Sequence, residues 1–237
     1  MLTPKSYGFR HFETHYITTE DNVIIHTILL KRPSHEESLT SPTLVYFHGN
    51  AGNIGHRLPN AIDFVNRLKC NVLLVEYRGF GLSKGTPSES GLLQDAYAAL
   101  KFLHGRNDIC SSKIVLFGRS LGGAVVIGVA HLLMTSSKLQ SNYKPAALIV
   151  ENTFTSIPEI SRHLLCSGRS QSCFARFFRL IPNCFYKNQY QSLRAISTIS
   201  LPTLFISGLA DELIPSEMMQ KLFNVSWFRY SCLFTVE

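Results

Sequence analysis

The sequence GRSLG at residues 118–122 places a serine between two glycines, which is the spacing of a nucleophile elbow. An apolar run of strand type precedes the serine, and an apolar helical pattern follows it at residues 121–134. A sharp strand-to-helix turn exposes the hydroxyl of such a serine, and glycines fit where the backbone crowds around it. We therefore predict that Ser120 is a nucleophile and that Gly118 and Gly122 shape its turn. The alternative is a glycine-rich helix start that binds nothing.

Acyl transfer also needs two hydrogen-bond donors for the negative charge that develops on the carbonyl oxygen. The amide of Leu121 is one expected donor, because it opens a helix whose dipole favours negative charge. The other is expected from the loop HGNAGN at residues 48–53, which directly follows an apolar run. Within this loop we expect Asn50 to present its main-chain amide, and His48 and Gly49 to shape the backbone.

A serine nucleophile is accompanied by an acid and a base, which follow it in the chain as serine, acid, histidine in this type of site. Asp211 comes just after an apolar run at residues 203–208, and Glu212 is the alternative acid. The nine histidines are at positions 11, 15, 26, 35, 48, 56, 104, 131 and 163, so every one precedes Asp211. The sequence thus contains a nucleophile, an oxyanion loop and an acid, but no base in the expected place.

Short apolar runs alternate with helical patterns along the rest of the chain, after an antiparallel hairpin expected around a turn at residues 20–22. This alternation predicts an α/β fold with a mostly parallel central sheet and helices on both faces. A single domain over residues 1–237 is expected. The runs lie at residues 43–47, 71–77, 113–118, 146–150 and 203–208, and the helical patterns at residues 57–69, 88–105 and 121–134.

An insertion rich in Phe, Arg and Cys lies between the last two runs, at about residues 156–195. One interpretation is a pair of surface helices whose aromatic side chains pack onto the sheet. The other is a small lid in which aromatic side chains, Phe177 and Phe178 among them, line an acyl pocket. The arginines of this segment also suit a membrane surface.

Composition argues against several classes of function. The net charge of +7 is scattered along the chain without a zinc spacing or a helix-turn-helix pattern, so no nucleic-acid partner is expected. The six cysteines form no C-x-x-C pair, which argues against a metal site or a redox motif. We expect no cofactor and no metal.

Five segments in order carry a resemblance to a known superfamily: YFHGNAGNIGHRLPNA, VEYRGFGLSKG, LFGRSLGGAVVI, VENTFTSIP and LFISGLADELIP. Over about residues 13–223 the chain resembles the α/β-hydrolase superfamily. The resemblance implies an α/β-hydrolase fold and a serine hydrolase with Ser120 and Asp211 as nucleophile and acid, and we expect a monomer. It also implies a carboxylic ester or thioester substrate, including palmitoyl-protein and other fatty-acyl thioesters. The relatives carry a membrane anchor, which implies membrane association, whereas the absence of a signal or anchor in these residues favours the cytoplasm.

The family places its catalytic histidine in a loop after the last strand, a strand that CLFTV at residues 232–236 can supply here. Three interpretations follow. The chain is a fragment of an active hydrolase, truncated before the histidine loop and the closing helix; or it is an inactive isoform that acts by binding; or another histidine, such as His48 or His163, substitutes. A non-catalytic binding pseudohydrolase and a serine peptidase are the alternative functions.

Overall fold

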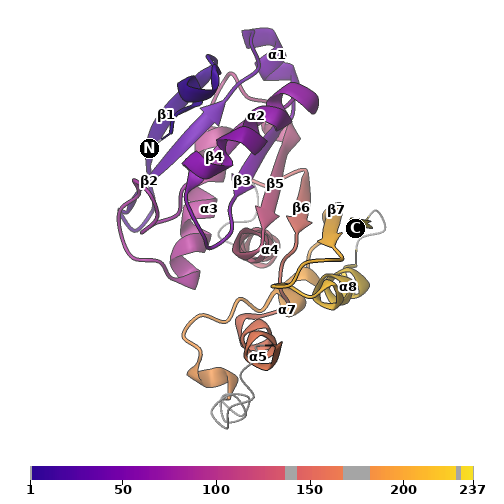
Figure 1. The fold of residues 1–237 in the computed structure, drawn as a ribbon. Coiled ribbons are helices and arrows are strands. Elements are labelled where there is room, and N and C mark those ends of the chain that lie inside the picture. Colours follow the sequence, from indigo (N-terminus) through magenta and orange to yellow (C-terminus); the bar gives the residue numbers. More distant parts are fainter. Residues whose placement is uncertain (1, 137–142, 168–181, 228–230, 237) are drawn as a thin grey trace.

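The structure is a computed structural model that describes residues 2–136, 143–167, 182–227 and 231–236. These residues form an eight-stranded sheet in the order β1-β2-β4-β3-β5-β6-β7-β8 (Figure 1). The strands are β1 (Phe12–Thr18), β2 (Ile24–Leu30), β3 (Thr43–Phe47), β4 (Asn71–Val75), β5 (Ile114–Arg119), β6 (Ala147–Glu151), β7 (Thr203–Gly208) and β8 (Cys232–Val236). β2 pairs antiparallel with both β1 and β4, whereas the strands from β4 to β8 run parallel. The predicted mostly parallel sheet with an initial hairpin is confirmed.

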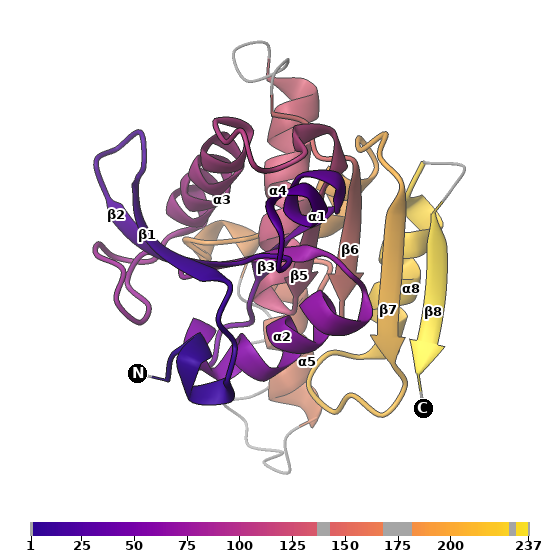
Figure 2. The same ribbon diagram turned by 90° about the horizontal axis from the view of Figure 1, so that it is seen from above.

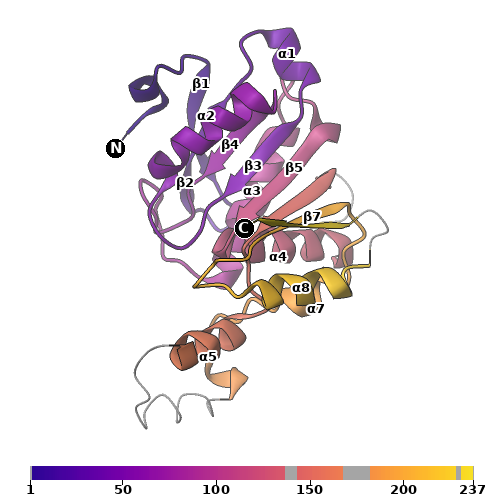
Figure 3. The same ribbon diagram turned by 45° about the vertical axis from the view of Figure 1, so that its right-hand side comes forward.

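Helices cover both faces of the sheet, which explains why strands such as β3 and β4 are buried along their whole length. Figure 3 shows α2 on one face and α4 and α8 on the other. The helices are α1 (His35–Thr40), α2 (Leu58–Arg67), α3 (Glu89–His104), α4 (Leu121–Thr135), α5 (Ile157–Ser167), α7 (Ser192–Ile196) and α8 (Ser216–Val225), with short 3-10 turns η1 (Pro4–Tyr7), η2 (Ile54–Arg57), η3 (Ser111–Lys113) and η4 (Asn183–Phe185). The three predicted helices correspond to α2, α3 and α4, while α1 and α8 lie outside the predicted patterns.

Two apolar cores result, one on each face. Leu58, Ala61 and Val65 of α2 pack with strand residues on one face, and the buried residues of α3, α4 and α8 form the larger core on the other. Among the described residues, no helix combines the length and the apolar character needed to cross a bilayer. The strands β1 and β8 lie at opposite edges of the sheet (Figure 2).

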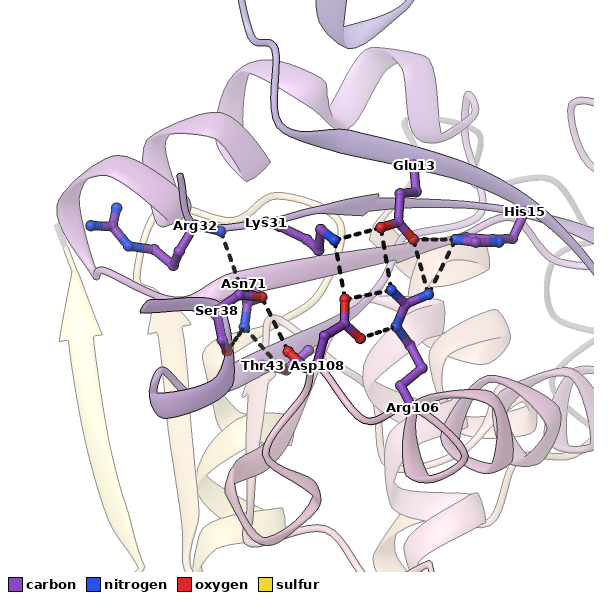
Figure 4. Close-up of polar contacts among 9 residues, drawn as sticks. All are labelled: Glu13, His15, Lys31, Arg32, Ser38, Thr43, Asn71, Arg106 and Asp108. Carbon is purple, nitrogen blue, oxygen red and sulfur yellow. Dashed lines mark hydrogen bonds and ion pairs between the residues drawn. The ribbon is translucent and has the colours of Figure 1, made fainter. Parts of the chain in front are cut away.

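A network of charged side chains attaches the hairpin to the loop after α3 (Figure 4). Lys31 contacts Glu13 at 2.5 Å and Asp108 at 3.1 Å, so it joins the two hairpin strands to that loop. Arg106 contacts Glu13 at 2.9 Å and Asp108 at 2.6 Å from the other side. Hydrogen bonds from Arg106 hold the pKa of Asp108 well below its usual range. The sheet edge is therefore fixed by ion pairs that are partly removed from water.

Candidate active site

Ser120 lies at the turn between β5 and α4. Its backbone has φ 54° and ψ −118°, a strained conformation for a residue with a side chain. The neighbouring strand holds this turn: the Ser120 amide donates to Glu151 O at 2.9 Å, and Thr153 Oγ1 donates to Ser120 O at 2.7 Å. Serine at a helix N-terminus commonly caps the helix, as Ser88 does for α3. Ser120 does not cap α4, so its hydroxyl is left for other partners.

The glycines on either side of Ser120 are required by close contacts. A Cβ atom at Gly118 would overlap the backbone of Gly122, and one at Gly122 would overlap the carbonyl of Phe47. The absence of side chains lets the first turn of α4 pack directly against the ends of β3 and β5. Gly118 and Gly122 therefore have the structural position that the sequence predicted for them.

The loop that begins with His48 lies beside Ser120, because β3 and β5 are parallel neighbours with Phe47 opposite Gly118. A Cβ atom at Gly49 would lie 3.4 Å from Ser120 Cβ and 3.9 Å from Ser120 Oγ. Asn50, Ser120 and Leu121 line one cavity of about 530 Å³. In the part of the chain that the structure describes, the amides of Asn50 and Leu121 donate no hydrogen bond. The fold thus brings both predicted oxyanion donors to the predicted nucleophile.

The cavity over Ser120 is mainly apolar. Its lining includes Phe80, Leu92, Phe154, Ile157, Phe185 and Tyr190, and Lys187 is the charged residue among the described lining residues. Residues 185–188 and 190 belong to the predicted insertion, and they form one wall of the cavity. The predicted pocket residues Phe177 and Phe178 lie outside the described residues.

One carboxylate of α3 anchors this wall. Glu89 accepts hydrogen bonds from the amides of Gln189 and Tyr190 at 2.7 and 3.0 Å. In return the Glu89 amide donates to Asn188 Oδ1 at 2.9 Å. Because these bonds join α3 to the segment that lines the cavity, Glu89 determines where that segment lies. No local pattern indicated this role, since about 100 residues separate the partners.

His48 is fully buried below the loop. Its Nδ1 lies 2.7 Å from Gly49 O and its Nε2 lies 3.1 Å from Glu76 Oε1. Glu76 is also fully buried, and its Oε2 accepts a hydrogen bond from the Ile54 amide at 3.2 Å. Both ring nitrogens of His48 therefore have partners within the loop and β4 region, and none of these partners is Ser120.

Asp211 lies just after β7, as predicted. Its Oδ2 accepts a hydrogen bond from Asn152 Nδ2 at 2.7 Å, and its Oδ1 accepts from the amides of Leu213 and Ile214 at 2.8 and 2.9 Å. Asn152 also accepts from the Gly208 amide at 2.8 Å, so it joins the ends of β6 and β7. Asn152 holds the predicted acid in place, a role that the sequence did not reveal.

No described histidine lines the Ser120 cavity or bonds to Asp211. His163 lies on α5 beside Glu159 and Lys221, where it lines a separate cavity. Neither His48 nor His163 thus contacts the predicted nucleophile. The described residues also contain no group of three or more His, Cys, Asp or Glu side chains placed to hold a metal ion.

Below Ser120, Glu151 ends β6. Burial raises the pKa of its carboxyl, an effect that the Arg119 guanidinium at 3.5 Å opposes.

The loop after β4 is held by Arg78, which pairs with the buried Asp95 of α3 at 2.9 Å and with Asp21 of the hairpin turn at 2.6 Å. This loop supplies Phe80 to the cavity. The Arg78 pairs therefore fix one part of the cavity wall.

Comparison with known proteins agrees with this geometry. The profile of a family described as alpha/beta hydrolase fold matches residues 44–172. The chain is 39% identical over 217 residues to the alpha/beta hydrolase domain-containing protein WAV2 of Arabidopsis thaliana, covering 90% of this chain and 66% of that protein. It is 40% identical over 224 residues to the protein bem46 of Schizosaccharomyces pombe, covering 94% of this chain and 68% of that protein.

Solved structures show the same fold at low sequence identity. The esterase Pf2001 of Pyrococcus furiosus matches with a TM-score of 0.73 at 20% identity, over 100% of this chain and 86% of that one. An acetyl xylan esterase from Paenibacillus sp. R4 matches with a TM-score of 0.66 at 19% identity, over 96% of this chain and 82% of that one. The chain belongs to the alpha/beta hydrolase family.

Proposed function

We propose that the protein is a serine-type hydrolase of acyl esters or thioesters, with Ser120 as nucleophile and the amides of Asn50 and Leu121 as oxyanion donors. One observation carries this proposal. The Ser120 hydroxyl does not cap helix α4, and Ser120 shares one apolar cavity with two amides that lack partners among the described residues. Such donors are available to a developing negative charge without first breaking a bond to protein.

The proposed reaction has two steps. A base takes the Ser120 proton, Oγ bonds to the acyl carbon, and the carbonyl oxygen becomes an anion that the amides of Asn50 and Leu121 stabilise. The carbonyl re-forms as the alcohol or thiol departs with the proton from the base. Water then attacks the acyl-enzyme in the same way, which releases the carboxylic acid product and restores Ser120. Asp211 is the proposed acid that orients the base.

The apolar lining supports a fatty-acyl substrate. Phe80, Leu92 and Ile157 offer apolar surface next to Ser120, and burying each methylene of an acyl chain contributes about 0.8 kcal/mol. We propose that long-chain esters and thioesters, including acylated protein at a membrane surface, are the substrate class. Lys187 and the loop residues Asn50 and Asn188 provide polar groups in the same lining.

The base is proposed to be a histidine outside these 237 residues. Two observations support this: no described histidine contacts Ser120, and the chain spans 66% and 68% of the lengths of the two relatives named above. In a serine protease, loss of the histidine costs on the order of 10⁶ in turnover. The 237-residue chain alone is therefore expected to be almost inactive.

A fluorophosphonate probe with added imidazole tests this proposal on the 237-residue chain. Free imidazole can replace a missing histidine, so it should accelerate labelling, and Ser120→Ala should abolish the labelling. A longer protein that includes the base should label quickly without imidazole. Labelling that persists in Ser120→Ala, or its absence from a longer protein shown to be folded, would contradict the assignment.

A binding protein without catalysis is the second candidate, favoured by the lack of a described histidine at Ser120. It predicts that fatty acids or acyl esters bind in the cavity unchanged. Binding of a fluorescent fatty acid without fluorophosphonate labelling, with or without imidazole, would favour this function.

A further inference from the structure

We infer that Glu76 is a positioning residue for the proposed oxyanion site, an inference that rests on the proposed function. Through the His48 ring, Glu76 fixes the peptide between Gly49 and Asn50 so that the Asn50 amide faces Ser120. The group consisting of Glu76, the His48 ring and the Gly49 carbonyl is called the Glu76–His48 clamp. It uses two buried side chains that have no direct part in the proposed reaction.

The donor and acceptor groups of the clamp determine which of its atoms carry protons. The Gly49 carbonyl can only accept, so the contact of 2.7 Å requires a proton on His48 Nδ1. The contact of 3.1 Å between His48 Nε2 and Glu76 Oε1 then needs one more proton, on either atom. In either case Glu76 prevents the ring from turning its Nδ1–H away from Gly49. The remaining Glu76 oxygen accepts from the Ile54 amide, which fixes the carboxylate itself.

Peptide geometry carries this restraint to the cavity. In a planar trans peptide the C=O of one residue and the N–H of the next point in opposite directions. Gly49 O points toward the His48 ring, so the Asn50 N–H points away from it. Asn50 lines the cavity with Ser120, and its amide has no partner among the described residues. The clamp therefore directs a free donor toward the place where the oxyanion would form.

The surroundings hold the clamp in one arrangement. Tyr77 donates from its hydroxyl to His48 O at 2.9 Å, which also fixes the backbone of His48. The ring centroids of Tyr77 and Phe80 lie 4.7 and 5.6 Å from that of His48. The His48 ring is thus enclosed by aromatic side chains, and Glu76 is the carboxylate that contacts it.

The experiment uses an alkylboronic acid and amide NMR on the 237-residue chain. The Ser120 oxygen adds to the trigonal boron, its proton leaves to the buffer, and a boronate oxygen enters the oxyanion position. The Asn50 and Leu121 amide protons should both shift downfield in the adduct. Imidazole is added to supply the missing base, and the lack of an adduct in its presence would overturn the proposed nucleophile and this inference with it. An adduct that shifts Leu121 but not Asn50 would overturn this inference alone.

Variants of Glu76 then test the clamp. Glu76→Gln can donate to His48 Nε2 and accept from Ile54, so it should keep the Asn50 shift. Glu76→Leu should lose the Asn50 shift, keep that of Leu121 and bind the boronate about 10²-fold more weakly, the lower range for one oxyanion donor. Asp108→Asn, a change at another buried carboxylate that lies in the hairpin network and not at the cavity, is the matched control and should keep both shifts. An Asn50 shift that survives in Glu76→Leu would overturn the inference.

A measurement on the unmodified chain covers the case in which Glu76→Leu does not fold. Nitrogen-15 NMR of the His48 ring should show a proton on Nδ1, with scalar coupling across the hydrogen bond to the Gly49 carbonyl carbon. An unprotonated Nδ1 would overturn the clamp.

Discussion

Replacing Arg78 with methionine should lower the free energy of unfolding by about 3 kcal/mol at pH 7. Arg78 is 5% exposed and Asp95 is fully buried, so the substitution leaves a buried carboxylate without its cation. Breaking such a pair by removing one partner costs about 3–5 kcal/mol. We expect the lower end of this range, because the backbone amide of residue 78 would still donate to Asp95, as it now does at 2.8 Å.

The loss of unfolding free energy in Arg78→Met should depend on pH, and the pKa of Asp95 determines the direction of that dependence. Burial raises the pKa of Asp95, and Arg78 opposes that rise, so the folded-state pKa rises further in the variant. A carboxyl whose folded pKa lies above its unfolded value of about 3.9 destabilises the fold above that folded pKa and less so below it. The difference in unfolding free energy between the variant and the wild type should therefore shrink as the pH falls from 7 toward the unfolded pKa of about 3.9.

Asp21, the second partner of Arg78, adds a small contribution in the same direction. Hydrogen bonds from Arg78 lower the pKa of Asp21 to about 2. The resulting stability is present above the unfolded pKa of about 3.9 and is lost as the pH falls toward the folded value. Because the Asp21 side chain is 38% exposed, solvent screening limits this contribution to less than about 1 kcal/mol.

Urea unfolding of the wild type, Arg78→Met, Asp95→Asn and the double variant would measure these effects. The double variant should be more stable than the sum of the two single losses predicts, because an asparagine at position 95 carries no charge that needs Arg78. A loss below about 1 kcal/mol at pH 7, or a loss that is the same at every pH, would refute the reasoning about the buried pair.

Three further predictions concern the turn, the hairpin and the cavity. Ser120→Gly should be about 1 kcal/mol more stable than Ser120→Ala, because glycine adopts φ 54° without strain; equal denaturation midpoints would contradict this. Asp108, whose pKa is lowered by Arg106, stabilises the fold above about pH 3.9 and loses that effect as the pH falls through its folded pKa. Urea unfolding should therefore show that Asp108→Asn has a lower free energy of unfolding than the wild type at pH 7 and that this difference becomes smaller in acid. A difference that is the same at every pH would argue against the ion pair. In a longer protein that includes the base, Ile157→Trp should slow hydrolysis of long-chain esters more than that of acetate esters; equal losses would remove the acyl-pocket assignment, and cleavage of anilides alone would favour a peptidase.

The sequence predicts those residues of the site that lie immediately after the end of a strand. Ser120, Asn50 and Asp211 each come just after an apolar run, and parallel strands bring their carboxyl ends to one edge of the sheet. Local patterns are sufficient for such residues. The apolar runs also predicted the sheet, because strands covered on both faces are almost continuously apolar.

The residues that the sequence did not reveal act through distant partners. Glu76 contacts His48 across 28 residues, and Asn152 contacts Asp211 across 59. Glu76 lies in an apolar run and Asn152 in an apparent loop, and neither has a local spacing that marks its role. Only the pairing of strands in space makes these contacts. Helix α8 does have a local signal, because Met218, Met219, Leu222 and Phe223 follow helical spacing, but the prediction did not use it.

The bonds from β6 to the Ser120 turn link the formation of the site to the order of folding. The Ser120 amide and carbonyl are held by Glu151 and Thr153, which enter the structure only when β6 pairs with β5. Parallel pairing joins residues far apart in the chain and is slow for that reason. A refolding chain that has assembled only through β5 would contain Ser120 but not the bonds that hold its strained backbone. Serine reactivity during refolding would then arise with the docking of β6, and a serine-directed probe would time that step.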